Sequence, residues 1–128
     1  MHSVFAHLIL DVESVEKSLG FYRDKLGFEV RSVGELDGHR LASIWANGFE
    51  ILLLQQPEED QPIINDRGRG LVMNFQVAGL RQVASQLKRE HVSVLRELDD
   101  AAFGDRTLLI TDPDGYAILL SEPVGTVH

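Results

Sequence analysis

The sequence predicts an α+β fold built from two copies of one unit, each a strand, a helix and three further strands. Residues 48–54 (GFEILLL) are closely similar to residues 115–121 (GYAILLS), and residues 7–12 (HLILDV) correspond to residues 72–77 (VMNFQV). Each of the latter two segments is followed by a stretch with helical spacing of apolar residues. A duplicated unit cannot bury its apolar face alone. We therefore expect two βαβββ modules in tandem that form a cupped mixed sheet around a central cavity.

The first module is expected over residues 4–57. The apolar run 5–12 predicts a buried strand, and Ser14 is a suitable N-cap for the helix that follows. The apolar face of this helix has spacings of four, three and four, and Gly27 is expected to end it in the left-handed region. That face consists of Val15, Leu19, Tyr22 and Leu26. Three strands are expected at 28–33, 40–46 and 49–55, with a hairpin turn at 34–38 and a tight Asn47-Gly48 turn.

The second module is expected over residues 71–123, after a polar linker at 58–70. Its helix presents Leu80, Val83, Ala84 and Leu87 on one face. The expected strands are 72–77, a short one at 92–94, 107–111 and 116–121; a loop is expected at 99–104 and a turn at 112–115 (DPDG). Residues 1–128 then form a single domain made of the two repeats.

Composition excludes several classes of function. A net charge of −8 argues against a nucleic-acid partner and is compatible with a cationic ligand. The absence of cysteine excludes disulfides and thiolate metal ligands. No apolar run is long enough to span a membrane and residues 1–10 lack a signal-peptide pattern, so we expect a cytoplasmic protein that does not bind membranes.

Alternation along the strands sorts their residues onto two faces. One face is uniformly apolar, as a face that packs against helices should be. The other mixes apolar residues with His7, Glu50, Asn74 and Gln76. An apolar concavity with a few polar groups is typical of small-molecule sites, so we expect the mixed face to line the cavity.

The motifs resemble those of the vicinal oxygen chelate superfamily. They are His7 in a first strand, residues 19–22 (LGFY) followed by 26–28 (LGF), and residues 112–116 (DPDGY) before the last strand. The superfamily includes glyoxalase I, extradiol dioxygenases and bleomycin-resistance proteins, and the resemblance covers roughly residues 5–123. It implies the fold more specifically than the activity. It also implies a homodimer.

In metal-dependent relatives, the first and fourth strands of each module supply the ligands. The resemblance carries these positions to His7, Leu52, Val72 and Leu119. Only His7 is a ligand type, and a catalytic metal needs about three protein ligands. We therefore expect no metal and no other cofactor. A shifted strand could instead bring Glu50 near His7, because Glu50 shares a face with Leu52.

Three functions remain open. The first is metal-independent binding of a small, partly hydrophobic molecule in a cavity between the modules, as in bleomycin-resistance-type relatives. The second is an enzyme of the lyase, isomerase or dioxygenase type that uses His7 and Glu50, with or without a divalent metal. The third is an interaction module with a filled cavity. No catalytic residue is assigned. The candidate ligand-binding residues are His7, Trp45, Glu50, Leu52, Val72, Asn74 and Leu119.

Some of these residues also have structural interpretations. His7 could be a core or rim histidine, Glu50 could point into water, and Trp45 could be core. Arg40 and Arg106 occupy matching places in the two modules, and we expect them to form surface ion pairs with the neighbouring Asp37 and Asp105.

Overall fold

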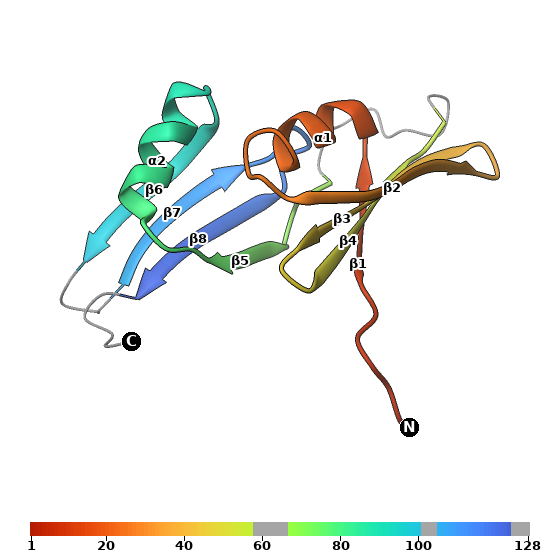
Figure 1. Ribbon diagram of the computed structural model, residues 1–128, viewed down its shortest axis with the longest axis horizontal. Coiled ribbons are helices and arrows are strands. Elements are labelled where there is room, and N and C mark those ends of the chain that lie inside the picture. Colours follow the sequence, from red (N-terminus) through yellow and green to blue (C-terminus); the bar gives the residue numbers. More distant parts are fainter. Residues whose placement is uncertain (58–66, 101–104, 124–128) are drawn as a thin grey trace. The chain divides into compact units, whose positions relative to one another are not determined.

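The computed structural model describes residues 1–57, 67–100 and 105–123. The chain divides into two compact units, unit 1 (residues 1–65) and unit 2 (residues 66–128). The elements of each unit follow the same order, strand, helix and three strands (Figure 1). The prediction of an α+β fold with two βαβββ units is confirmed.

The described residues of unit 1 form one four-stranded sheet and one helix. Its elements are β1 (Leu8–Val12), α1 (Val15–Tyr22), β2 (Glu29–Leu36), β3 (His39–Ala46) and β4 (Phe49–Gln55). The strand order is β1-β4-β3-β2, with β1 parallel to β4 and the other pairs antiparallel.

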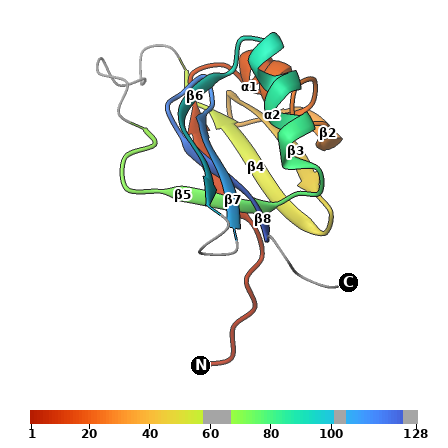
Figure 2. The ribbon, with the colours of Figure 1, turned by 90° about the vertical axis from the view of Figure 1, so that its left-hand side faces the viewer.

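Unit 2 has the same topology. Its elements are β5 (Val72–Gln76), α2 (Leu80–Arg89), β6 (Ser93–Asp100), β7 (Asp105–Thr111) and β8 (Ala117–Pro123). The order is β5-β8-β7-β6, and β5 is parallel to β8. Figures 1 and 2 show α2 on one side of this sheet.

Each core lies between the helix and one face of its own sheet. In unit 1 the buried strand residues on this face include Leu10, Ile51 and Leu53, and α1 contributes Val15, Leu19 and Tyr22. In unit 2 the corresponding strand residues are Met73, Ile118 and Leu120, and α2 contributes Leu80, Ala84 and Leu87. All these strand residues belong to the apolar face that alternation predicts.

The last strand of each unit caps the helix of that unit. Ser14 is the N-cap of α1 and accepts from the Lys17 N–H at 3.2 Å, as expected, while Gln55 Oε1 accepts from the Val15 N–H at 2.8 Å. In unit 2 the cap residue is Gly79, and Glu122 takes the place of Gln55. Its carboxylate accepts from the N–H groups of Gly79 (2.7 Å) and Leu80 (3.2 Å).

Several expected boundaries were wrong. The strands β2 and β6 are longer than predicted, because a β-bulge at Arg31 and another at Leu95 interrupt the period-2 pattern. Asp99 and Asp100, which were expected in a loop, therefore belong to β6. The helix α1 ends at Tyr22, and Leu26 follows it in a turn that Gly27 completes at φ +78°. The expected linker residues 58–66 and loop residues 101–104 lie outside the described residues.

The turn before β8 packs against Arg67 and Gly68, near the start of unit 2. Asp112 Oδ1 accepts from the N–H groups of Asp114 (2.9 Å) and Tyr116 (2.8 Å). Arg67 forms an ion pair with Asp114 at 3.4 Å, and both side chains are almost fully buried. Gly68 lies against the same turn, since a Cβ placed there would be 2.3 Å from the Gly115 carbonyl oxygen.

Within the parts of the chain that the structure describes, neither helix is long and apolar enough to cross a membrane.

Gly68→Ala is expected to destabilise the protein by about 2 kcal/mol, because the added methyl group meets backbone atoms that cannot move cheaply. Urea unfolding measures the change. Gly34→Ala is the control, since nothing lies within 4 Å of a Cβ there and the φ of Gly34 is not positive. An equal loss in both variants would contradict this packing.

Glu122 makes stability depend on pH. The N–H groups of Gly79 and Leu80 hold the pKa of its carboxyl below its ordinary value of 4.5. The stabilisation is therefore complete above the unfolded pKa and is lost as pH falls through the lowered folded pKa. Glu122→Gln should lower the melting temperature at pH 7, with a much smaller difference from wild type near about pH 3. Gln55→Glu is the reciprocal variant and should add acid-sensitive stability; a pH-independent effect of both would refute the assignment.

Candidate functional site

The face of the unit 1 sheet opposite α1 brings His7 and Glu50 together. The register pairs Leu8 with Ile51 in parallel, which sets His7 beside Glu50. His7 Nδ1 lies 3.4 Å from Glu50 Oε1. The side chains are 32% and 24% exposed, so each is shielded on one side and open to solvent on another.

The Glu50 carboxylate is held from a second direction by β3. Ser43 and Trp45 point to the same face, because Ser43 pairs with Leu52 and Trp45 with Glu50. The Ser43 hydroxyl donates to Glu50 Oε2 at 2.5 Å, and the Trp45 indole Nε1–H donates to Ser43 Oγ at 3.2 Å. Both carboxylate oxygens of Glu50 therefore have partners, and its side chain is fixed in one orientation.

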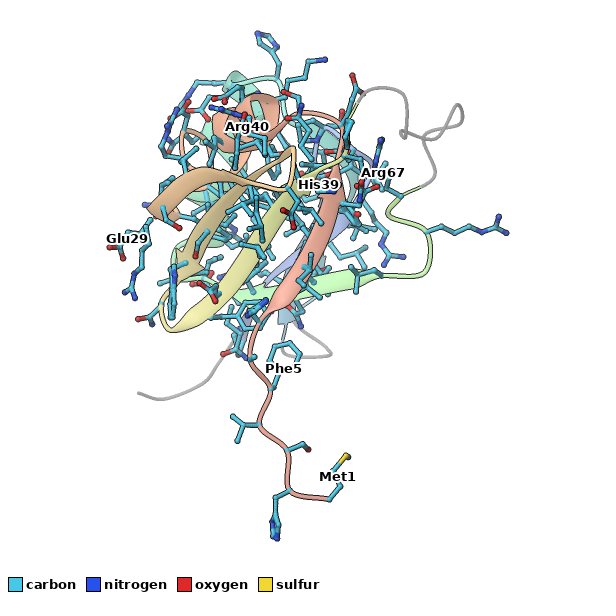
Figure 3. The ribbon with its side chains drawn as sticks, turned by 90° about the vertical axis from the view of Figure 1, so that its right-hand side faces the viewer. Met1, Phe5, Glu29, His39, Arg40 and Arg67 are labelled. Carbon is cyan, nitrogen blue, oxygen red and sulfur yellow. The ribbon has the colours of Figure 1, made fainter. Side chains whose placement is uncertain are left out.

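The contacts continue onto the edge strand β2. Arg31 occupies the β-bulge, which directs its side chain over Trp45, with the guanidinium carbon 3.9 Å from the ring centroid. Arg31 Nε is also 3.5 Å from a carboxylate oxygen of Glu29, at the outer edge of the unit 1 sheet (Figure 3). These residues form a connected series that runs across the sheet from β2 through β3 and β4 to the residue before β1. We call this series the polar chain; it consists of Glu29, Arg31, Trp45, Ser43, Glu50 and His7.

Apolar side chains surround the polar chain. Ile9 is 54% exposed, and its pairing partner Leu52 is half-buried on the same face, as is Leu54. The face therefore combines exposed apolar surface with a few fixed polar groups, as small-molecule sites do.

Unit 2 lacks the polar chain at the equivalent positions. Its registers place Val72 where unit 1 has His7, Ala117 where it has Glu50, and Leu109 where it has Ser43. Thr111 replaces Trp45, and Leu95 occupies the bulge where Arg31 lies in unit 1. The same backbone thus carries connected polar side chains in one unit and mostly apolar ones in the other.

The remaining predicted site residues lie in unit 2. Val72 is 57% exposed, Leu119 is half-buried, and Asn74 is exposed and pairs with Leu119 across β5 and β8. The Ser121 hydroxyl donates to Asn74 Oδ1 at 2.9 Å. The seven predicted residues therefore fall into two groups, one on each unit: His7, Trp45, Glu50 and Leu52, and Val72, Asn74 and Leu119.

Most of the chain matches a known family. The profile of the Glyoxalase/Bleomycin resistance protein/Dioxygenase superfamily matches residues 4–120.

The chain belongs to this superfamily.

Solved structures of superfamily proteins share the fold. One from Frankia sp. EAN1pec, described as a glyoxylase/bleomycin resistance protein/dioxygenase domain, is 18% identical with a TM-score of 0.79, over 100% of this chain and 97% of that one. A glyoxalase family protein from Enterococcus faecalis is 20% identical with a TM-score of 0.74 (93% and 97% covered). Trypanothione-dependent glyoxalase I of Leishmania major is 18% identical with a TM-score of 0.73 (89% and 82% covered). At these identities the likeness shows the fold alone.

The residues of unit 1 do not fit the metal site that the superfamily implies. His7 and Glu50 are two ligand types that contact each other, and the second Glu50 oxygen accepts from Ser43. Across residues 1–57, 67–100 and 105–123, no group of three or more His, Asp or Glu side chains could hold a metal ion. A structural or catalytic metal needs about three protein ligands, and Leu52 supplies none.

Sequence reasoning missed Ser43, Arg31 and Glu29. Ser43 could have been found, because it is two residues before Trp45 on a strand and so shares its face. Arg31 could not have been found in this way, because the β-bulge that sets the direction of its side chain interrupts the alternation of strand residues between the two faces.

Ser43→Ala removes both the donor to Glu50 and the acceptor for Trp45. It is expected to cost about 1 kcal/mol of stability and to change the fluorescence emission of Trp45, the one tryptophan of the chain. Ser32→Ala, at an exposed position of β2, is the control and should change neither. An unchanged emission spectrum in Ser43→Ala would contradict the contact.

Proposed function

We propose that this superfamily member binds a small, partly hydrophobic molecule on the unit 1 face that carries the polar chain, and that binding requires no metal. The observation that carries the proposal is the difference between the two units. A purely structural face would need only apolar or small side chains, as the equivalent positions of unit 2 have. Holding polar groups in fixed positions on a half-exposed face costs desolvation and conformational free energy. A role in ligand binding would explain why unit 1 has such groups although folding does not require them.

The contacts indicate how such a ligand would be held. Trp45, Ile9 and Leu52 offer apolar and aromatic surface. Glu50, facing His7 Nδ1, favours the tautomer with the proton on that nitrogen, which leaves Nε2 as an acceptor. The ligand is then expected to present a hydroxyl or N–H group to His7 and an apolar body to the surrounding side chains.

The donor set supports metal-independent binding. A divalent ion would have to displace the Ser43 hydroxyl or His7 from Glu50, and the described residues of unit 1 offer no third protein ligand beside this pair. Elemental analysis after dialysis against nickel, zinc, manganese and iron should find well under one ion per chain. One ion per chain that is lost in His7→Ala would overturn this part of the proposal.

A thermal-shift screen with small aromatic and heterocyclic alcohols and amines tests binding itself. Compounds that raise the melting temperature of the wild type should lose most of that effect in His7→Ala and Glu50→Gln. Val72→Ala, at the position of unit 2 equivalent to His7, is the matched control and should retain it. Hits that are equally effective on all variants would show that the ligand does not use the polar chain.

The contact between His7 and Glu50 favours a second candidate, proton transfer. A histidine oriented by a carboxylate can act as a general base. In this reaction His7 Nε2 would take the proton from a carbon next to a carbonyl group, and the electrons of the broken C–H bond would pass to the enolate oxygen. Deuterium incorporation into dihydroxyacetone in D₂O, abolished in His7→Ala, is the expected result; exchange at the buffer rate would eliminate this candidate.

A further inference from the structure

Unit 2 has a groove on the opposite side of its sheet from Val72 and Asn74. The groove has a volume of about 250 Å³ and is lined by residues of α2, β6 and β7. Its apolar lining includes Leu80, Ala84 and Leu108.

The repeat explains why room is left there. Ser14 and Gly79 are the N-caps of the two helices. When positions are counted from these caps, Ala84 of α2 corresponds to Leu19 of α1. Leu19 is buried against the sheet of unit 1. Replacing a leucine by an alanine at this position withdraws three carbon atoms from the interface between helix and sheet, and α2 therefore leaves space where α1 fills it.

The charges of the groove also differ from those of unit 1. There, Arg40 of β3 pairs with Glu16 of α1, with Arg40 Nε 2.7 Å from Glu16 Oε1. The prediction that Arg40 pairs with Asp37 was therefore wrong. In unit 2 the equivalent of Arg40 is Arg106, and the equivalent of Glu16 is Arg81. Two guanidinium groups thus line the groove where unit 1 has one guanidinium and one carboxylate.

Ion pairs also lie at the groove. Lys88 forms an ion pair with Glu97, and Arg106 lies 3.6 Å from Glu122 Oε1, which also caps α2. The described lining thus holds three cationic side chains (Arg81, Lys88 and Arg106) and one carboxylate (Glu97), in a chain of net charge −8.

From this combination we infer that the groove is a second ligand site, for a small organic anion with a compact apolar body such as an aromatic carboxylate. The carboxylate lies toward Arg81 and Arg106, and the ring lies over Leu80, Ala84 and Leu108. Arginine suits this role because its planar guanidinium matches carboxylate geometry. The site is independent of the polar chain of unit 1.

The test is a titration of the full chain with benzoate, followed by backbone amide NMR. Benzoate should shift the amide signals of α2 and β7, and benzamide, the uncharged analogue, should bind at least about tenfold more weakly because it lacks the charge. Arg81→Glu, which restores the charge pattern of unit 1, should weaken benzoate binding by about tenfold or more.

Two further variants make the result decisive. Ala84→Leu restores the side chain of unit 1 and should abolish binding by filling the groove. Arg89→Glu makes the same charge change on the same helix outside the groove and should alter the affinity by less than about twofold. Equal affinities for benzoate and benzamide, unchanged binding in Arg81→Glu, or shifts in residues away from α2 and β7 would overturn the inference.

Discussion

The parallel pairing of β1 with β4 is the constraint on which the candidate site depends. It aligns Leu8 with Ile51 and so brings His7 beside Glu50. A shift of one residue would turn one of these side chains toward the helix-covered core, where an unpaired charge costs several kcal/mol. The apolar residues Leu10, Ile51 and Leu53, buried under α1, thus fix the register that places the polar pair on the other face.

In each unit, the two faces of the sheet are under different constraints. Each sheet has one face that packs against its helix, and both units meet this need with the same kinds of apolar residues. The opposite face is free to differ between the units. In unit 1 it carries the polar chain from Glu29 to His7, and in unit 2 the equivalent positions hold mainly aliphatic side chains. The helix side diverges as well, since Leu19 and Glu16 of unit 1 correspond to Ala84 and Arg81 of unit 2.

Much of the fold could be predicted, because strand alternation, the Ser14 cap and the Asn47-Gly48 turn are local signals. The two β-bulges could not, since a bulge is the point at which alternation stops being informative. At the candidate site, the shared face of His7 and Glu50 followed from alternation, but the contact itself depends on strand order and register. The family resemblance assigned the ligand position of β4 to Leu52, whereas the structure places the carboxylate of Glu50 beside His7.

The central claim is that the polar chain of unit 1 recognises the ligand. The most direct measurement is the NMR signal of the Trp45 indole N–H. Its assignment is unambiguous because the chain has a single tryptophan. This N–H donates a hydrogen bond to Ser43 in the middle of the polar chain, so the signal reports on that position. A compound that stabilises the wild type should shift this signal on titration, and Glu50→Gln should suppress the shift together with the binding. A compound that binds with the indole signal unmoved, while amides elsewhere in the chain respond, would contradict the account.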